Sequence, residues 1–258
     1  MGTGFVDEPV PLIADSGRRY RIYRSRISVQ WRKPSSFMAR RPLIVRVIQP
    51  TWTLLNELAL NIRTTPPAQS SAMESAEAPA GPGSDPRPRH NDSGRYEVPD
   101  YFYMRKVLQV LSPLPEDVVF DVGCGLGRFL CLAARRNVRK CVGVELRAQL
   151  CDAARENARR LRAPHAQIEI RCGDAATADI SEGTIYYMYN PFGATTMRDV
   201  FANLRASFAT NPRTIKIAYY NSIHEELFRA CGWLDKYHAF RIKSGMPVTF
   251  WRSQPGLR

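Results

Sequence analysis

The hydrophobic pattern divides the chain into regions of different character. From about residue 101 onward, short apolar runs alternate with segments whose apolar residues recur every three or four positions. Short apolar runs bounded by turn residues predict buried strands, and the three-to-four spacing predicts amphipathic helices. Their alternation predicts an α/β fold in which a doubly wound, mostly parallel sheet carries helices on both faces.

The expected elements can be placed by residue number. We expect strands at residues 117–122, 141–145, 168–170, 184–189 and 214–219. A terminal antiparallel pair at residues 237–242 and 248–251 would turn at Gly245. Helices are expected at residues 101–111, 128–136, 148–161, 197–208 and 223–231. The pattern therefore predicts a Rossmann-like seven-strand sheet that is mostly parallel, with an antiparallel last strand.

The first hundred residues differ from the rest. Residues 1–64 form a basic N-terminal extension, within which residues 44–60 could make an amphipathic helix interrupted near Pro50. Residues 65–95 are rich in Pro, Ser, Ala and Gly and predict a disordered linker. We therefore expect the main folded domain at residues 96–258. No uninterrupted apolar run reaches about 18 residues, so we expect no membrane span.

The chain is strongly basic, with a formal net charge of +13. Residues 1–66 contribute eleven Lys and Arg against four Asp and Glu. This excess permits binding to nucleic acid, an anionic membrane surface or an acidic protein. No recognisable RNA-binding motif accompanies it, and a bias in overall composition explains it equally well.

The chain has six cysteines, all from residue 124 onward: Cys124, Cys131, Cys141, Cys151, Cys172 and Cys231. None forms a C-x-x-C pair and no histidine lies at metal-ligand spacing, so we expect no metal site. Most lie inside apolar patterns, where free cysteine behaves as a small hydrophobic residue. We therefore expect reduced cysteines and a cytoplasmic protein.

A glycine-rich loop closes the first expected strand and opens a helix. Glycines allow the backbone to approach a ligand closely, and the helix N-terminus offers N–H groups to an anion. Polar groups also follow the next three strands. The candidate residues are Asp121, Gly123, Cys124, Gly125, Gly127, Glu145, Asp174, Ala175, Asn190, Pro191 and Phe192. Each could be an ordinary cap or turn residue, but their joint placement at four successive strand ends favours one binding site.

These residues make the chain, over roughly residues 101–251, resemble a class I S-adenosylmethionine (SAM)-dependent methyltransferase. The resemblance implies that Asp121 and the backbone of the glycine loop, with Cys124, hold the methionine end of SAM. It implies that Glu145 holds the ribose, and that Asp174 and Ala175 hold the adenine. A dinucleotide dehydrogenase is the competing interpretation, but its loop reads G-x-G-x-x-G, whereas this one reads G-x-G-x-G after an acidic residue.

The segment Asn190-Pro191-Phe192 is similar to the Asn-Pro-Pro-aromatic motif of methyltransferases that act on amino groups. An asparagine carbonyl can accept a hydrogen bond from an amine and direct its lone pair at the methyl group. An aromatic ring can stack on a flat or cationic acceptor. This motif has one proline where the family has two, and an Asn-Pro turn after a strand is also ordinary turn chemistry. It therefore leaves the acceptor atom open.

The glycine loop, the segments 143–145 and 171–174, and Asn190 and Phe192 before residues 201–204 also resemble, more distantly, the core of the histone-lysine methyltransferases that lack a SET domain. This resemblance implies a protein lysine as acceptor. We therefore expect SAM-dependent methyl transfer to an unidentified acceptor, with an amine favoured. Two alternatives stay open. One is methylation of a hydroxyl on a small molecule or glycan, or of nucleic acid; the other is a non-catalytic SAM-binding module. No histidine stands out as a general base.

Overall fold

The structure is a computed structural model of the 258-residue chain, and it describes residues 43–65 and 98–253. Side chains are described from residue 51 onward. The prediction of a basic extension falls largely on residues 1–42, and the linker falls on residues 66–97, both outside the described residues. The described residues from Val47 onward belong to one compact unit.

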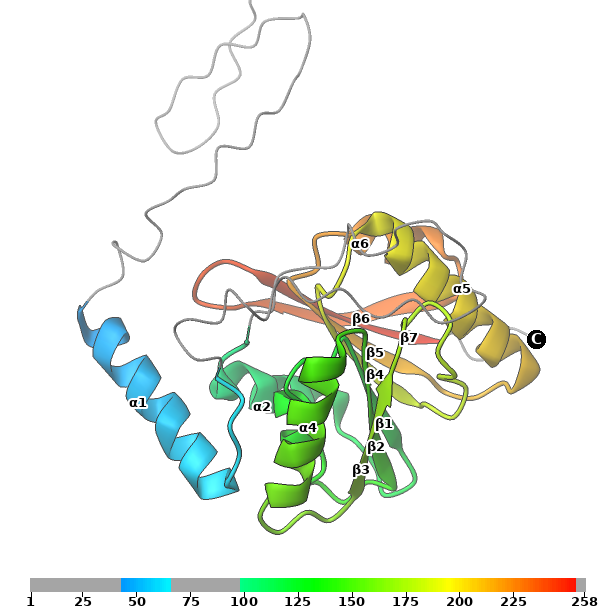
Figure 1. Cartoon of the computed structure of the whole chain (residues 1–258). Coiled ribbons are helices and arrows are strands. Elements are labelled where there is room, and N and C mark those ends of the chain that lie inside the picture. Colours follow the sequence, from blue (N-terminus) through cyan, green and yellow to red (C-terminus); the bar gives the residue numbers. More distant parts are fainter. Residues whose placement is uncertain (1–42, 66–97, 254–258) are drawn as a thin grey trace, which may run out of the picture. The chain divides into compact units, whose positions relative to one another are not determined.

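The core of this unit is a seven-stranded sheet (Figure 1). The strand order is β3-β2-β1-β4-β5-β7-β6, and the first five pair in parallel. β7 is antiparallel to both of its neighbours, so the predicted sheet is confirmed. The strands are β1 Val118–Val122, β2 Lys140–Glu145, β3 Gln167–Cys172, β4 Ile185–Tyr189, β5 Lys216–Tyr220, β6 Leu234–Arg241 and β7 Pro247–Ser253.

Six helices are described: α1 Leu43–Leu60, α2 Tyr101–Leu111, α3 Arg128–Ala133, α4 Ala148–Arg160, α5 Ala194–Thr210 and α6 Glu225–Ala230. The expected interruption near Pro50 is not seen, because α1 runs through this residue. A proline removes one intrahelical hydrogen bond. The last turns of α1 are held by packing of the buried side chains of Asn56 and Leu60, which sustains the helix beyond the proline.

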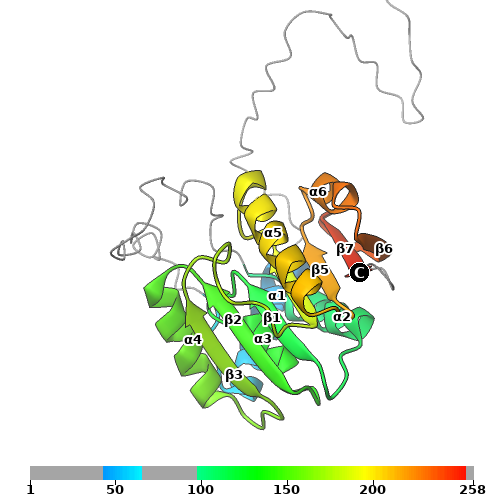
Figure 2. The same cartoon turned by 90° about the vertical axis from the view of Figure 1, so that its right-hand side faces the viewer.

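Helices α2, α3 and α4 lie on one face of the sheet, and α5 and α6 lie on the other (Figure 2). All five residues of β1 are buried, as expected for a central parallel strand covered on both faces. Phe120 packs on the α5 side, whereas Val119 packs on the α3 side. Because side chains alternate along a strand, Asp121 shares the α3 side with Val119. A carboxyl group thus stands in the core where the pattern calls for an apolar residue.

The chain just after α1 belongs to the same core. Leu60 and Ile62 are buried together with residues of α2 and α3. The boundary predicted near residue 64 stays a prediction, because the chain beyond it lies outside the described residues. Within the described ranges, no helix is long and apolar enough to cross a membrane.

Candidate functional site

The glycine loop follows β1 and lies against two neighbouring segments. Gly123, Gly125 and Gly127 all have positive φ angles, of 79°, 54° and 79°, which favour glycine. The Gly123 amide donates a hydrogen bond to the Val144 carbonyl at 2.8 Å. A Cβ atom added to Gly123 would lie 2.5 Å from the Cβ of Pro191. The loop is therefore in direct contact with the turn after β4.

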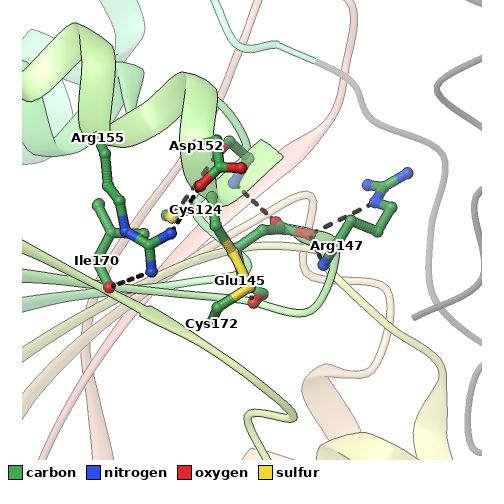
Figure 3. The surroundings of a disulfide bond; sticks show 9 residues. Cys124, Glu145, Arg147, Asp152, Arg155, Ile170 and Cys172 are labelled. Atoms are coloured by element: carbon green, nitrogen blue, oxygen red, sulfur yellow. Dashed lines mark hydrogen bonds and ion pairs between the residues drawn. A yellow bond between two sulfur atoms is a disulfide. The ribbon is translucent and has the colours of Figure 1, made fainter. Parts of the chain in front are cut away.

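Glu145 ends β2 and directs its carboxylate to the glycine loop (Figure 3). Its Oε2 accepts a hydrogen bond from the Gly125 amide at 2.9 Å. Its Oε1 accepts from the backbone amide of Arg147 at 3.1 Å and faces the Arg147 Nε at 3.4 Å. The sequence analysis missed Arg147, although an arginine two residues after a strand-end glutamate was a usable signal. These contacts fix the carboxylate at the carboxyl end of the sheet.

Asp121 is a second buried carboxyl group in the same region. Burial raises its pKa well above the usual range, and the negative charge of Glu145 raises it further. Its neighbour in the strand register is Tyr187 of β4. The hydroxyl of Tyr187 is buried and has no hydrogen-bond partner among the described residues.

These features provide a test of whether the site fits SAM. Two neighbouring buried carboxyl groups favour a ligand that carries positive charge. SAM carries a sulfonium and an ammonium group, and its ribose offers hydroxyl donors. The positive-φ glycines leave no side chain between the loop backbone and a ligand. The residues present therefore fit this cofactor.

The loop after β3 holds the residues predicted to contact adenine. The Oδ1 of Asp174 accepts a hydrogen bond from the Ala176 amide at 2.9 Å, which closes a turn. The Gly173 amide donates to the Glu145 carbonyl at 2.9 Å. Ala175 is buried. The loop that carries the candidate adenine residues is thus joined to Glu145 by a backbone hydrogen bond from Gly173.

The turn after β4 contains the predicted acceptor residues. Asn190 has a left-handed φ angle of 37°, and its Oδ1 accepts a hydrogen bond from the Tyr219 hydroxyl at 3.2 Å. Burial raises the pKa of Tyr219 to about 12, so this phenol remains a donor. Phe192 is buried in the core cluster that includes α5. The ring of half-buried Tyr189 packs edge-on against Tyr220, with centroids 4.9 Å apart.

Arg128 is a buried cation that the sequence analysis did not single out. It is the first residue of α3 and is only 6% exposed. Its Nη2 pairs with Glu57 of α1 at 3.1 Å, its Nε donates to Thr64 Oγ1 at 2.6 Å, and its Nη1 donates to the Pro99 carbonyl at 3.0 Å. It connects the helix after the glycine loop to chain segments on both sides of residues 66–97. Its position directly after Gly127, at the start of an apolar helix, was the available signal.

The prediction that all six cysteines are reduced is wrong for two of them. Cys151 of α4 and Cys172 of β3 form a disulfide bond, with Cα atoms 5.9 Å apart. The other four are free. The pairing was hidden because 21 positions separate the two residues in sequence, while packing of α4 on β3 brings them together. Among the described residues, no three His, Cys, Asp or Glu side chains gather as a metal site would require.

Comparison with known proteins gives a family match at the same residues. Residues 119–209 match the family model described as a methyltransferase domain. A protein-lysine N-methyltransferase of Saccharolobus islandicus (strain REY15A) is 33% identical over 87 residues, which are 33% of this chain and 53% of that protein. A 23S rRNA (uracil(1939)-C(5))-methyltransferase of Xanthomonas campestris pv. campestris (strain 8004) is 48% identical over 60 residues, 23% of this chain and 13% of that protein.

Among solved structures, an RNA methyltransferase from Salinibacter ruber in complex with S-adenosylhomocysteine is similar, with a TM-score of 0.47 and 24% identity. The match covers 63% of this chain and 97% of that chain. The chain spans about half the length of the lysine methyltransferase and a smaller part of the rRNA methyltransferase. The family match, with the seven-strand order and the glycine loop, identifies a class I methyltransferase domain in this chain, the type whose cofactor is SAM.

Proposed function

We propose that this protein transfers the sulfonium methyl group of SAM to an amine, with a protein lysine as the favoured acceptor. The observation that carries the proposal is the contact between Pro191 and Gly123. It brings the Asn190 turn against the loop proposed to hold the cofactor, so the cofactor and acceptor groups would share one edge of the sheet.

Each cofactor residue has a specific role in this proposal. Asp121, with the backbone of Gly123, Cys124, Gly125 and Gly127, would hold the methionine end. Glu145 would accept hydrogen bonds from the ribose hydroxyls in addition to its bond from Gly125. Asp174 and Ala175 would border the adenine. The contribution of these groups is orientation: they would place the reacting atoms in line and exclude water.

The acceptor side would use Asn190 to position an amine. The Tyr219 hydroxyl donates to the Asn190 oxygen, which orients the carboxamide and leaves the oxygen's second lone pair for an amine N–H. An amine must lose a proton before it can attack, which for a free lysine costs about 5 kcal/mol at neutral pH. With a pKa near 12, Tyr219 would not serve as the base. We therefore propose that the amine reaches the site already neutral.

The rRNA methyltransferase relatives make methylation of a pyrimidine carbon the second candidate. A carbon acceptor of this kind needs covalent activation by a nucleophile such as a thiolate. Burial raises the pKa of Cys131 to about 12, and burial with the charges of Asp121 and Glu145 raises that of Cys124 well above the usual range. Neither would provide a thiolate near neutral pH. This favours the amine over the carbon.

The test has two stages. Calorimetric titration with SAM and with S-adenosylhomocysteine should give saturable binding to the wild type, weakened in Asp121→Asn. Radiolabelled methyl transfer to a cell extract, followed by separate protease and ribonuclease digestion, should then give a label that only protease releases. A label that ribonuclease releases would favour nucleic acid as the acceptor instead. Cofactor binding without labelling of any fraction, glycans and small molecules included, would favour the non-catalytic module.

A further inference from the structure

The disulfide bond lies directly beside the proposed ribose-binding residue. Cys172 is the neighbour of Glu145 in the β2–β3 register, and Figure 3 shows the two side by side. The Sγ of Cys151 lies 3.3 Å from the Glu145 carbonyl oxygen. Both sulfur atoms therefore border the backbone that carries the Glu145 carboxylate.

The same crosslink also constrains the segments on either side of Glu145. The Cys151 amide donates a hydrogen bond to the Arg147 carbonyl at 3.0 Å, and the Arg147 amide holds the Glu145 carboxylate. On the other side, Cys172 precedes Gly173, whose amide holds the Glu145 carbonyl, and then Asp174. The disulfide thus fastens the start of α4 to the loop that carries the candidate adenine residues.

One of the two sulfur-bearing residues faces solvent. Cys151 is fully buried, whereas Cys172 is exposed on β3, an edge strand of the sheet. A dissolved thiolate can reach the Cys172 side of the bond. Exposed disulfides of this kind are the labile ones in proteins. By contrast, the free cysteines Cys124, Cys131 and Cys141 are buried.

We propose that Cys151–Cys172 is a reversible thiol–disulfide exchange site that controls the affinity of the protein for SAM. A dithiol reductant supplies the two electrons. One of its thiolates attacks Cys172 Sγ, the S–S bond breaks, and Cys151 leaves as a thiolate that takes up a proton. The second thiol of the reductant, as its thiolate, then closes the reductant's own disulfide and releases Cys172, which is protonated in turn. Two protein thiols and one oxidised reductant result.

Reduction changes the surroundings of Glu145 in two ways. The start of α4 is no longer fastened to the end of β3, so Arg147 and the Asp174 loop gain freedom relative to each other. The Cys151 sulfur also acquires a proton, so its thiol can donate a hydrogen bond to the Glu145 carbonyl oxygen. That oxygen already accepts a hydrogen bond from the Gly173 amide, so the two donors would share it. A ligand that must order these segments binds more weakly to the freer form.

The expected coupling is about tenfold, within the usual range for linked sites. The oxidised protein should bind S-adenosylhomocysteine about tenfold more tightly than the reduced protein. Linkage is reciprocal, so saturating S-adenosylhomocysteine should shift the thiol–disulfide equilibrium toward the disulfide by the same factor. This inference rests on the proposed placement of SAM at Glu145 and Asp174.

The experiment uses the full chain, oxidised in air or reduced with dithiothreitol and kept under nitrogen. Calorimetry with S-adenosylhomocysteine gives the two affinities. Alkylation in a dithiothreitol redox buffer, with and without S-adenosylhomocysteine, followed by mass spectrometry, gives the oxidised fraction. Cys172→Ser, at an exposed position, should lose the redox response. Cys231→Ser, which changes a free cysteine of the C-terminal half, should keep it.

Three results would overturn the inference, and they are distinguishable. Equal affinities in the two forms reject the switch while leaving the proposed function intact. Alkylation of both Cys151 and Cys172 in the air-oxidised protein shows that the bond does not form. A failure of S-adenosylhomocysteine to bind either form rejects the proposed cofactor site together with the switch.

Discussion

The carboxyl edge of the parallel strands has two halves, one at β1, β2 and β3 and one at β4 and β5, and they are built differently. On the side of β1, β2 and β3, the hydrogen-bond donors are backbone amides: Gly125 donates to the Glu145 carboxylate and Gly173 donates to the Glu145 carbonyl, at 2.9 Å each. On the side of β4 and β5, Asn190 meets a tyrosine side chain at the longer distance of 3.2 Å. Backbone amide donors survive most substitutions, whereas a contact between two side chains is lost when either one is changed. The first half suits an invariant ligand, and the second suits a choice of acceptor.

The halves also differ in charge. The cofactor side buries two carboxyl groups, Asp121 and Glu145, and burial next to Glu145 raises the pKa of Asp121 well above the usual range. The acceptor side contains buried phenols such as Tyr219, which stay neutral because burial raises the pKa to about 12. The first side therefore attracts a cation, while the second orients a neutral group. The predictions below test this division.

The largest expected effect concerns how the cofactor side is anchored. Arg128→Ala leaves Glu57, whose side chain is only 12% exposed, without its cation, and breaking a buried ion pair costs about 3–5 kcal/mol. The free energy of unfolding in urea should fall by that amount. Arg159→Ala removes a cation that is 72% exposed beside Glu156, and should change stability by less than about 1 kcal/mol. Equal losses in the two variants would refute a special role for Arg128.

The next effect separates binding from stability. Asp121→Asn should weaken SAM binding about 100-fold, since hydrogen bonds to charged groups contribute about 1.5–3 kcal/mol. It should also raise the melting temperature at pH 7 by about 3 °C. The pKa of Asp121 in the folded protein is raised above its value of about 3.8 in the unfolded chain. Ionisation of this group in the wild type therefore lowers the free energy of unfolding as pH rises from the unfolded-state pKa to the folded-state pKa.

Calorimetry and melting curves from pH 4 to pH 8 check both parts of the Asp121→Asn prediction. Asp152→Asn, at a side chain that is 77% exposed, serves as the control and should change neither quantity. A variant that binds SAM as the wild type does would remove Asp121 from the cofactor site.

A smaller effect is expected on the acceptor side. Asn190→Gly removes the carboxamide while retaining the left-handed backbone, which an alanine would strain. The rate of methyl transfer at saturating SAM should fall about 30-fold, the loss of one well-placed hydrogen bond, while the SAM dissociation constant stays unchanged. Asn61→Gly, at a left-handed position with φ 57° at the end of α1, is the matched control. Weakened SAM binding in Asn190→Gly would erase the division between the halves.

The smallest effect per step is the change in rate over one pH unit. If the acceptor is a lysine amine, the rate below saturation should rise about tenfold per pH unit from pH 7 toward pH 10, because only the neutral amine attacks. Tyr219 does not titrate in this window, since burial raises its pKa to about 12. Rates of label transfer to the protein fraction at fixed SAM check this. A flat profile would argue against an unassisted amine.

The elements with regular burial were predictable. Strand β1 was expected at residues 117–122 and spans Val118–Val122, because a central strand buried on both faces is a continuous apolar run. The edge strand β3 was expected at 168–170 and spans Gln167–Cys172. Its ends, Gln167 and Cys172, are exposed and lie outside the continuous apolar run. The positions of the glycine loop and Glu145 were predictable too, because the loop follows β1 directly and Glu145 ends β2; their roles toward a cofactor stay a prediction.

The sequence by itself determined the sheet and the polar residues at its carboxyl edge, because periodicity and glycine placement are local properties of the chain. Only the tertiary structure decided which of these residues touch. The ion pair of Arg128 with Glu57, the contact of Pro191 with Gly123 and the disulfide between Cys151 and Cys172 join residues that are 71, 68 and 21 positions apart. Such contacts depend on how helices pack against the sheet, and no spacing along the chain encodes that packing.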